Sequence, residues 1–156
     1  MHKISLVTVG SVKTSWIAEG SREYSTRISH DVSFEVIEIS PSKQKDPAKQ
    51  SAEESVAILK RLEKAEGEIW ALDEKGQEMS SQKFADAIGG LMDQGIAITF
   101  VLGGAYGLGE DIRRRGNRIV RLSVMTFPHE LCRLVILEQL YRALQIRKGT
   151  GYHHGN

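Results

Sequence analysis

Four glycines lie within seven residues, directly after the most apolar run of the chain, residues 96–102. A continuous apolar run of this kind predicts a central parallel strand that is buried on both faces. In open α/β sheets, ligands bind beyond the carboxyl ends of the strands, and glycine lets the backbone approach a ligand closely. The segment therefore indicates either a ligand-binding loop or a plain strand-to-helix turn that needs positive φ angles. The four glycines are Gly103, Gly104, Gly107 and Gly109.

The residues around this loop indicate which kind of ligand it would hold. The glycine spacing matches neither the GxGxxG dinucleotide motif nor a phosphate-binding P-loop. Glu110 and Asp111 follow the loop, where we expect them to cap the next helix and to occupy the place that would otherwise attract a phosphate. A ligand with an adenosine group and a positive charge, such as S-adenosylmethionine, therefore fits this loop better than NAD or ATP.

Arg133 lies in the middle of an apolar face of the last expected helix, residues 130–147. A second apolar patch lies on another side of this helix, and a helix that is apolar on nearly all sides is buried on nearly all sides. In a chain of this size, a homodimer interface is one place to bury the second patch. A buried arginine is costly unless it is paired. Arg133 is thus either part of an ion pair with Glu130 or Glu138, or a site residue that faces a ligand at the interface.

The end of the chain holds Tyr152, His153 and His154 between glycines. One interpretation is a frayed terminus. The other is a tail that becomes ordered on a substrate, with Tyr152 stacked on a base and a histidine assisting proton transfer. His129, at the start of the last helix, is a further histidine in this part of the chain. The spacing of these histidines and Cys132 is not that of metal ligands, so we expect no metal.

The charges of the chain are unevenly distributed. The 21 Lys and Arg residues nearly balance the 20 Asp and Glu residues, which argues against a polybasic binder or an acidic tail. However, residues 1–100 carry a net charge of −4 and residues 101–156 a net charge of +5, and eight of the nine basic residues in the second part are arginines. Arginine suits phosphate and base contacts. A candidate phosphate track is therefore the run of Arg113, Arg114 and Arg115 with the nearby Arg118 and Arg121. The alternative interpretation is that these arginines form a helix face exposed to solvent.

Strand and helix patterns alternate along the chain, which predicts one α/β domain over residues 1–156, with a mostly parallel sheet flanked by helices. We expect residues 40–50 to form a loop and residues 73–76 to end the third strand. The chain opens directly into a strand pattern, has one cysteine and has no apolar run long enough to span a membrane, so we expect a cytoplasmic protein without membrane contact. The expected strands are 4–9, 34–39, 68–72, 96–102 and 119–122, and the expected helices are 16–28, 52–64, 80–92, 111–115 and 130–147.

Three segments, VLGGAYGLG, LSVMTFPHELCRLVILEQLYRA and the terminal GYHHGN, closely resemble the bacterial ribosomal RNA large subunit methyltransferase H family of the SPOUT superfamily. The resemblance extends over the full length, and the second segment is its most specific part. It implies a SPOUT-type fold with a C-terminal trefoil knot, a homodimer, and S-adenosylmethionine as the cofactor held in the knot. It also implies methyl transfer to N3 of a pseudouridine in helix 69 of 23S rRNA, within assembled ribosomes.

The resemblance also assigns site residues. It places His129 and Arg133 near the active centre, and Tyr152 and His153 in a tail that helps to build the substrate site across the dimer. With Arg142 and Tyr152 we count His154 as substrate-binding, although family members usually carry Arg or Lys at its place, which makes a phosphate contact there pH-dependent or absent. The implied cofactor contacts are Leu72, Gly103, Gly104, Leu122, Ser123, Val124, Met125, Thr126 and Phe127.

The implied methyl transfer to N3 requires proton transfer as well as alignment of the reactants. N3 of a uracil-type ring carries a proton that must leave as the methyl group arrives, so the enzyme must align two reactants and accept a proton. We expect His129, Arg133 and His153 to be the catalytic group, with His153 nearer the base and the general base left open. Two alternatives remain: a non-catalytic ribosome- or RNA-binding module that uses the arginine-rich C-terminal third, and a different α/β enzyme that binds a nucleotide in the glycine loop.

Overall fold

The fold is built on a five-stranded sheet of order β2-β1-β4-β3-β5, in which every neighbouring pair is parallel. This computed structural model describes residues 1–155, and Asn156, the last residue of the expected tail, lies outside them. The expected α/β fold with a parallel sheet is confirmed. The strands are β1 (Lys3–Val9), β2 (Ser33–Ile39), β3 (Glu68–Glu78), β4 (Ile98–Leu102) and β5 (Arg118–Arg121). The helices are α1 (Ser15–Ser29), α2 (Pro47–Leu62), α3 (Ser81–Asp93), α4 (Glu110–Arg115) and α5 (His129–Lys148).

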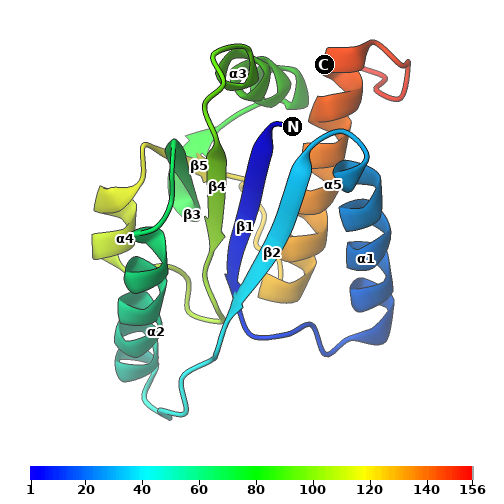
Figure 1. The fold of residues 1–156 in the computed structure, drawn as a ribbon. Coiled ribbons are helices and arrows are strands. Elements are labelled where there is room, and N and C mark those ends of the chain that lie inside the picture. Colours follow the sequence, from blue (N-terminus) through cyan, green and yellow to red (C-terminus); the bar gives the residue numbers. More distant parts are fainter. Residues whose placement is uncertain (156) are drawn as a thin grey trace.

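The helices cover the two faces of the sheet in two groups (Figure 1). The core on one face joins the sheet to α1, α3 and α5, and includes the packed aromatic rings of Trp70, Phe84 and Phe100. The core on the other face joins the sheet to α2 and α4. All five residues of β4 are buried, as expected for a central strand with helices on both sides. Within residues 1–155, none of the helices is both long and apolar enough to pass through a membrane.

The expected loop over residues 40–50 is wrong at its C-terminal end, because α2 already begins at Pro47. The Asp46 side chain accepts a hydrogen bond from the Lys49 N–H at 3.0 Å, and proline fits the first helical turn, where its missing N–H is not needed. The polar composition of this segment favoured a loop, although it contains the N-cap and the first residues of α2.

The expected stop of β3 at residues 73–76 is also wrong, because the strand continues to Glu78 after a register shift between Leu72 and Gln77. Gly76 makes this possible. A Cβ atom at Gly76 would lie 2.7 Å from backbone atoms of Ile119 and Val120, so only glycine lets the extension of β3 run this close to β5.

A carboxylate of α5 holds the start of α1. Glu130 accepts hydrogen bonds from the backbone N–H groups of Lys13 and Thr14, both at 3.1 Å, and the Thr14 side chain makes no capping bond of its own. These N–H groups hold the pKa of Glu130 below its ordinary value. The first turn of α5 is thereby joined to the turn that follows β1.

We expect Glu130→Gln to lower the melting temperature at pH 7 by about 2–4 °C, because it removes a charged acceptor from two N–H groups. A carboxylate whose pKa is lowered in the folded state stabilises above its unfolded pKa and loses this effect as the pH falls through the folded pKa. The difference from wild type should therefore shrink below the ordinary value of 4.5. Thermal unfolding between pH 3 and 7, with Glu19→Gln on the exposed side of α1 as control, tests this; a difference that does not change with pH contradicts it.

Candidate active site

A cavity of about 840 Å³ lies at the carboxyl ends of β4 and β5, beside the register shift of β3. Its wall is formed by residues 72–75 of β3, the loop 102–108, the segment 121–127, Arg113 of α4 and the first turn of α5. This volume is within the usual range for small-molecule sites, and the position matches the rule for open parallel sheets. All of the residues expected to contact a cofactor line this one cavity: Leu72, Gly103, Gly104, Leu122, Ser123, Val124, Met125, Thr126 and Phe127.

The glycine loop is folded tightly on itself. A Cβ atom at Gly103 would lie 2.6 Å from the backbone of Gly107, and the Gly107 N–H donates to the Gly104 carbonyl at 3.1 Å. Gly107 has a φ of +76°, which favours glycine. These glycines were expected to let the backbone approach a ligand; here they also let the loop close on its own backbone.

The same loop is packed against α2. A Cβ atom at Gly104 would lie 2.8 Å from a carboxylate oxygen of the buried Glu54, and one at Gly109 would lie 2.7 Å from the hydroxyl of Ser55. Glu54 is itself held by the N–H of Ser42 at 3.0 Å. The loop therefore has the cavity on one side and the supporting residues of α2 on the other.

The two acidic residues after the loop do not cap α4, which corrects our expectation. Gly109 is the N-cap and makes no side-chain bond, whereas Glu110 pairs with Arg113 and Asp111 with Arg114, each at 2.8 Å. In a helix of six residues, a carboxylate and an arginine three positions apart lie on the same side, so they meet each other.

Arg113 connects three walls of the cavity. Besides Glu110, its guanidinium donates to the Leu108 carbonyl at 2.7 Å and to the Asp73 carboxylate at 3.4 Å. Its side chain is only 14% exposed. Asp73 was expected only to help end the third strand and Arg113 only to belong to the phosphate track, so neither was expected to line this cavity.

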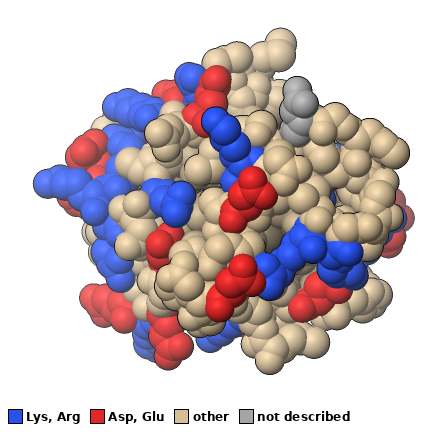
Figure 2. Space-filling model, turned by 90° about the horizontal axis from the view of Figure 1, so that it is seen from above, with Lys and Arg blue, Asp and Glu red and all other residues tan. Residues whose placement is uncertain are grey.

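Four of the five arginines of the candidate phosphate track pair with carboxylates of this chain, so the track stays a prediction. In addition to the pairs of Arg113 and Arg114, Arg118 lies 3.4 Å from Glu68 and Arg121 lies 2.9 Å from Glu78. On the face seen in Figure 2, basic and acidic side chains are likewise interspersed.

Arg133 does not line the cavity but is buried behind it, with 5% of its surface exposed. Its guanidinium donates to Glu38 at 2.7 Å, to the Thr8 hydroxyl at 3.2 Å and to the Gly10 carbonyl at 2.7 Å. Arg133 thus ties α5 to the ends of β1 and β2, one helical turn from His129, which does line the cavity.

The expected ion pair of Arg133 with Glu130 or Glu138 is therefore wrong. Glu130 binds the turn before α1, and Glu138 pairs with Arg142 at 2.9 Å. The side of α5 that carries Arg133 packs on the sheet, so its partner Glu38 comes from a strand 95 residues earlier in the chain.

The tail is folded back on α5 as far as residue 155, rather than frayed. The Tyr152 hydroxyl donates to Glu138 at 2.7 Å, and its ring meets that of Tyr141 edge to face, with centroids 4.9 Å apart. Arg142 lies over the Tyr152 ring and within 3.1 Å of Nδ1 of His153. Burial and the Glu138 carboxylate raise the pKa of Tyr152 above its ordinary range.

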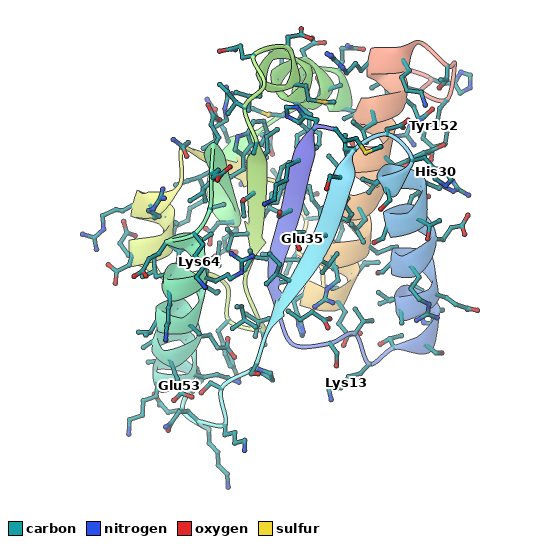
Figure 3. The ribbon with its side chains drawn as sticks, viewed as in Figure 1. Lys13, His30, Glu35, Glu53, Lys64 and Tyr152 are labelled. Carbon is teal, nitrogen blue, oxygen red and sulfur yellow. The ribbon has the colours of Figure 1, made fainter. Side chains whose placement is uncertain are left out.

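Within one chain, the tail lies far from the cavity. α5 has 20 residues, so its two ends are about 30 Å apart. In Figure 3, Tyr152 lies at the opposite end of the molecule from Lys13, whose N–H is bound by the first turn of α5. The site residues expected from the sequence therefore form two groups: His129 and the cofactor residues at the cavity, and Arg142, Tyr152, His153 and the exposed His154 at the far end of α5.

Cys132 was not expected to contribute to the site, yet its side chain lines the cavity. Its thiol lies 3.8 Å from the Phe127 carbonyl, and burial raises the pKa of this thiol above its ordinary value. Among residues 1–155, no cluster of three or more His, Cys, Asp or Glu side chains is arranged to hold a metal ion.

We expect Gly103→Ala to destabilise the protein by about 1–3 kcal/mol, because the added Cβ atom meets backbone rather than a movable side chain. Gly90→Ala on α3 is the matched control, since nothing lies within 4 Å of a Cβ atom there. It should stabilise the protein by about 0.5–1 kcal/mol, the cost of glycine inside a helix. Urea unfolding measures both; equal stability of the two variants contradicts the close packing of the loop.

Comparison with solved structures shows a methyltransferase fold. A probable methyltransferase from Bordetella pertussis Tohama I matches with a TM-score of 0.59 and 16% identity, over 92% of this chain and 96% of that one. The SpoU methyltransferase AviRb from Streptomyces viridochromogenes, solved in complex with the cofactor AdoMet, matches with a TM-score of 0.50 and 11% identity, over 97% of this chain and 60% of that one.

Sequence comparison is more specific. A family model described as "Predicted SPOUT methyltransferase" matches residues 2–153. Proteins named "Ribosomal RNA large subunit methyltransferase H" are 35% identical in Trichlorobacter lovleyi and 37% identical in Streptococcus gordonii, each over 97% of this chain and 99% of the relative. The family expected from the sequence motifs is thereby confirmed: this chain belongs to the SPOUT methyltransferases and, among them, to the ribosomal RNA large subunit methyltransferase H family.

Proposed function

We propose that this chain is an S-adenosylmethionine-dependent methyltransferase that methylates N3 of a pseudouridine in helix 69 of 23S rRNA, within assembled ribosomes. The observation that carries the proposal is the cavity at the ends of β4 and β5, around which the glycine loop, the segment 122–127 and His129 meet. The names of the relatives support an rRNA substrate. The pseudouridine, its N3 position and the ribosomal context follow from the family resemblance.

The residues of the cavity fit S-adenosylmethionine. Leu72, Leu102 and Leu122 provide apolar surface for an adenine ring, and the adjacent loops present backbone groups for its edges. Glu74 is an exposed carboxylate in the same wall, which suits a positively charged sulfonium group, whereas the Asp73 carboxylate is already paired with Arg113. When bound, this cofactor supplies an electrophilic methyl group. The protein then has to align the base with it, exclude water and accept the proton from N3.

The course of the chain around the cavity supports the proposed trefoil knot. From β4 the chain runs through the glycine loop, α4 and β5, then returns through residues 122–128 to α5. Both connecting segments line the same cavity, as a knot that holds the cofactor requires. Two loops held together in this way form a rigid site.

A homodimer would bring the two groups of site residues together. His129 is at the cavity of its own chain, whereas His153, Tyr152, Arg142 and His154 are at the far end of α5. We propose that the tail of a second copy reaches the cavity, with His129 and His153 as candidate bases and Arg133 holding α5 in place. The buried Nε2 of His153, which has no hydrogen-bond partner within residues 1–155, supports a role beyond its own chain. The ion-paired arginines weaken the alternative of a non-catalytic RNA-binding module.

Calorimetric titration separates the candidate ligands. We expect one S-adenosylmethionine to bind per chain, and neither ATP nor NAD to bind, because the glycine loop matches neither a phosphate-binding P-loop nor the dinucleotide motif. A mass assay of unmodified ribosomes then tests for one methyl group added to helix 69. Binding of ATP or NAD alone would reject the methyltransferase function, and methylation of a different nucleotide would reject the proposed target.

Complementation tests whether the site is shared between two chains. We expect His129→Ala and His153→Ala each to slow single-turnover methylation at least about tenfold. In mixed dimers of the two variants, one of the two cavities keeps His129 and receives an intact tail, so an equal mixture should recover roughly a quarter of the wild-type activity. No recovery contradicts a shared site, a monomeric mass at micromolar concentration contradicts the dimer, and two fully active variants contradict the histidine base.

A further inference from the structure

Three large apolar side chains are exposed at the edge of the cavity. Tyr106 is 57% exposed, Val124 is 69% exposed and Met125 is 73% exposed, and all three belong to the segments that line the cavity. They make up half of the six large hydrophobic residues exposed in residues 1–155. Apolar side chains that gather in water at one place indicate a binding surface.

Tyr106 belongs to a hydrogen-bonded turn. It lies at the tip of the turn that the Gly107 N–H closes on the Gly104 carbonyl at 3.1 Å. The turn itself packs against Gly103 and the buried Glu54. An aromatic ring on a fixed turn loses little freedom when a flat ligand stacks on it.

The ring of Tyr106 is also free of intramolecular partners. The other tyrosines of the chain, Tyr24, Tyr141 and Tyr152, pack on one another within 6 Å, and Arg27 or Arg142 lies over their rings. In the described part of the chain, neither a second ring nor a cation covers Tyr106. Both a face of its ring and its hydroxyl group are thus available to a ligand.

The neighbouring charges indicate a nucleotide rather than an apolar partner. Lys75 is exposed and lines the same cavity, and among residues 1–155 it has no ion-pair partner. A ring that can stack on a base, next to a cation that can meet a phosphate, is the usual combination for unpaired RNA. Enzymes that modify a base inside a structured RNA must also take it out of its stack, and the base then needs a new surface to stack on.

We propose that Tyr106 is the stacking platform for the nucleobase that enters the cavity, with Lys75 beside it to meet the backbone phosphate. This inference rests on the proposed function, because it takes RNA as the substrate and the cavity as the site of methyl transfer. Tyr106 does not hold the cofactor in this scheme. Its contribution is to bind and orient the base.

The test compares Tyr106→Ala and Tyr106→Phe, with Trp16→Ala as the matched control. Trp16 is an aromatic residue of similar exposure, 60%, that lies on α1 and does not line the cavity. We expect Tyr106→Ala to raise the KM for unmodified ribosomes about 10- to 100-fold, the range for losing one base–aromatic stack. Its kcat at saturating ribosomes should change less than threefold. Tyr106→Phe, which keeps the ring, and Trp16→Ala should stay close to wild type.

Two readouts do not depend on turnover. The S-adenosylmethionine affinity of all three variants, measured by calorimetry, should equal that of wild type, because Tyr106 is 57% exposed and is not among the expected cofactor contacts. Co-sedimentation with ribosomes should be weakened by Tyr106→Ala and Lys75→Ala only.

Each outcome has a distinct meaning. If wild type binds S-adenosylmethionine and methylates rRNA but Tyr106→Ala keeps a normal KM, the platform is rejected and the proposed function stands. Equal losses in Tyr106→Ala and Tyr106→Phe would also reject stacking. If wild type neither binds S-adenosylmethionine nor methylates rRNA, the proposed function is rejected and this inference with it.

Discussion

The buried guanidinium of Arg133 is the interaction on which the placement of α5 depends. It bonds to Glu38, Thr8 and the Gly10 carbonyl, so one side chain joins the last helix to the ends of the first two strands. A buried charge without these partners would be strongly destabilising, which makes the position of α5 highly specific. Because α5 carries His129 and Cys132 at one end and supports the tail at the other, both halves of the candidate site depend on this contact.

Most of the cavity wall is formed by loops between the strands and helices. The sheet contributes the ends of its strands, while the glycine loop and the segment 122–127 form most of the wall. The loop is held from behind by Glu54 and Ser55, and Arg113 ties it to α4 and β3. A site made of loops can therefore be as well fixed as one made of helices when each loop has its own buried support.

Much of the fold could be predicted from the sequence, because short β-branched runs and helical spacing are local properties. The buried β4 strand, the helix α3 and the parallel sheet all follow from such patterns. Two of the failures have a different cause, namely contacts between distant segments. The partner of Arg133 depends on how α5 packs on β2, and the extension of β3 depends on how closely Gly76 approaches β5.

In the candidate site, too, the residues expected from the sequence differ in kind from those that only the fold brings together. The expected cofactor contacts come from the family resemblance, most of them from two short stretches of the chain, and the structure brings all of them to one cavity. Asp73, Arg113 and Cys132 were not expected at the cavity, although Arg113 belongs to the candidate phosphate track and Cys132 to a family segment, because only the meeting of β3, α4 and α5 brings them there. The separation of the tail from the cavity could not be predicted either, because it depends on the length and direction of α5 and on the bonds that hold Tyr152 against it.

The single thiol in the cavity wall has a chemical consequence of its own. A site for an alkyl donor must not contain a better nucleophile than its substrate, and a thiolate is among the strongest that a protein offers. Burial raises the pKa of Cys132, so a smaller fraction of this thiol is ionised than of an exposed cysteine at the same pH. The packing that shapes this wall therefore also lowers the reactivity of its thiol.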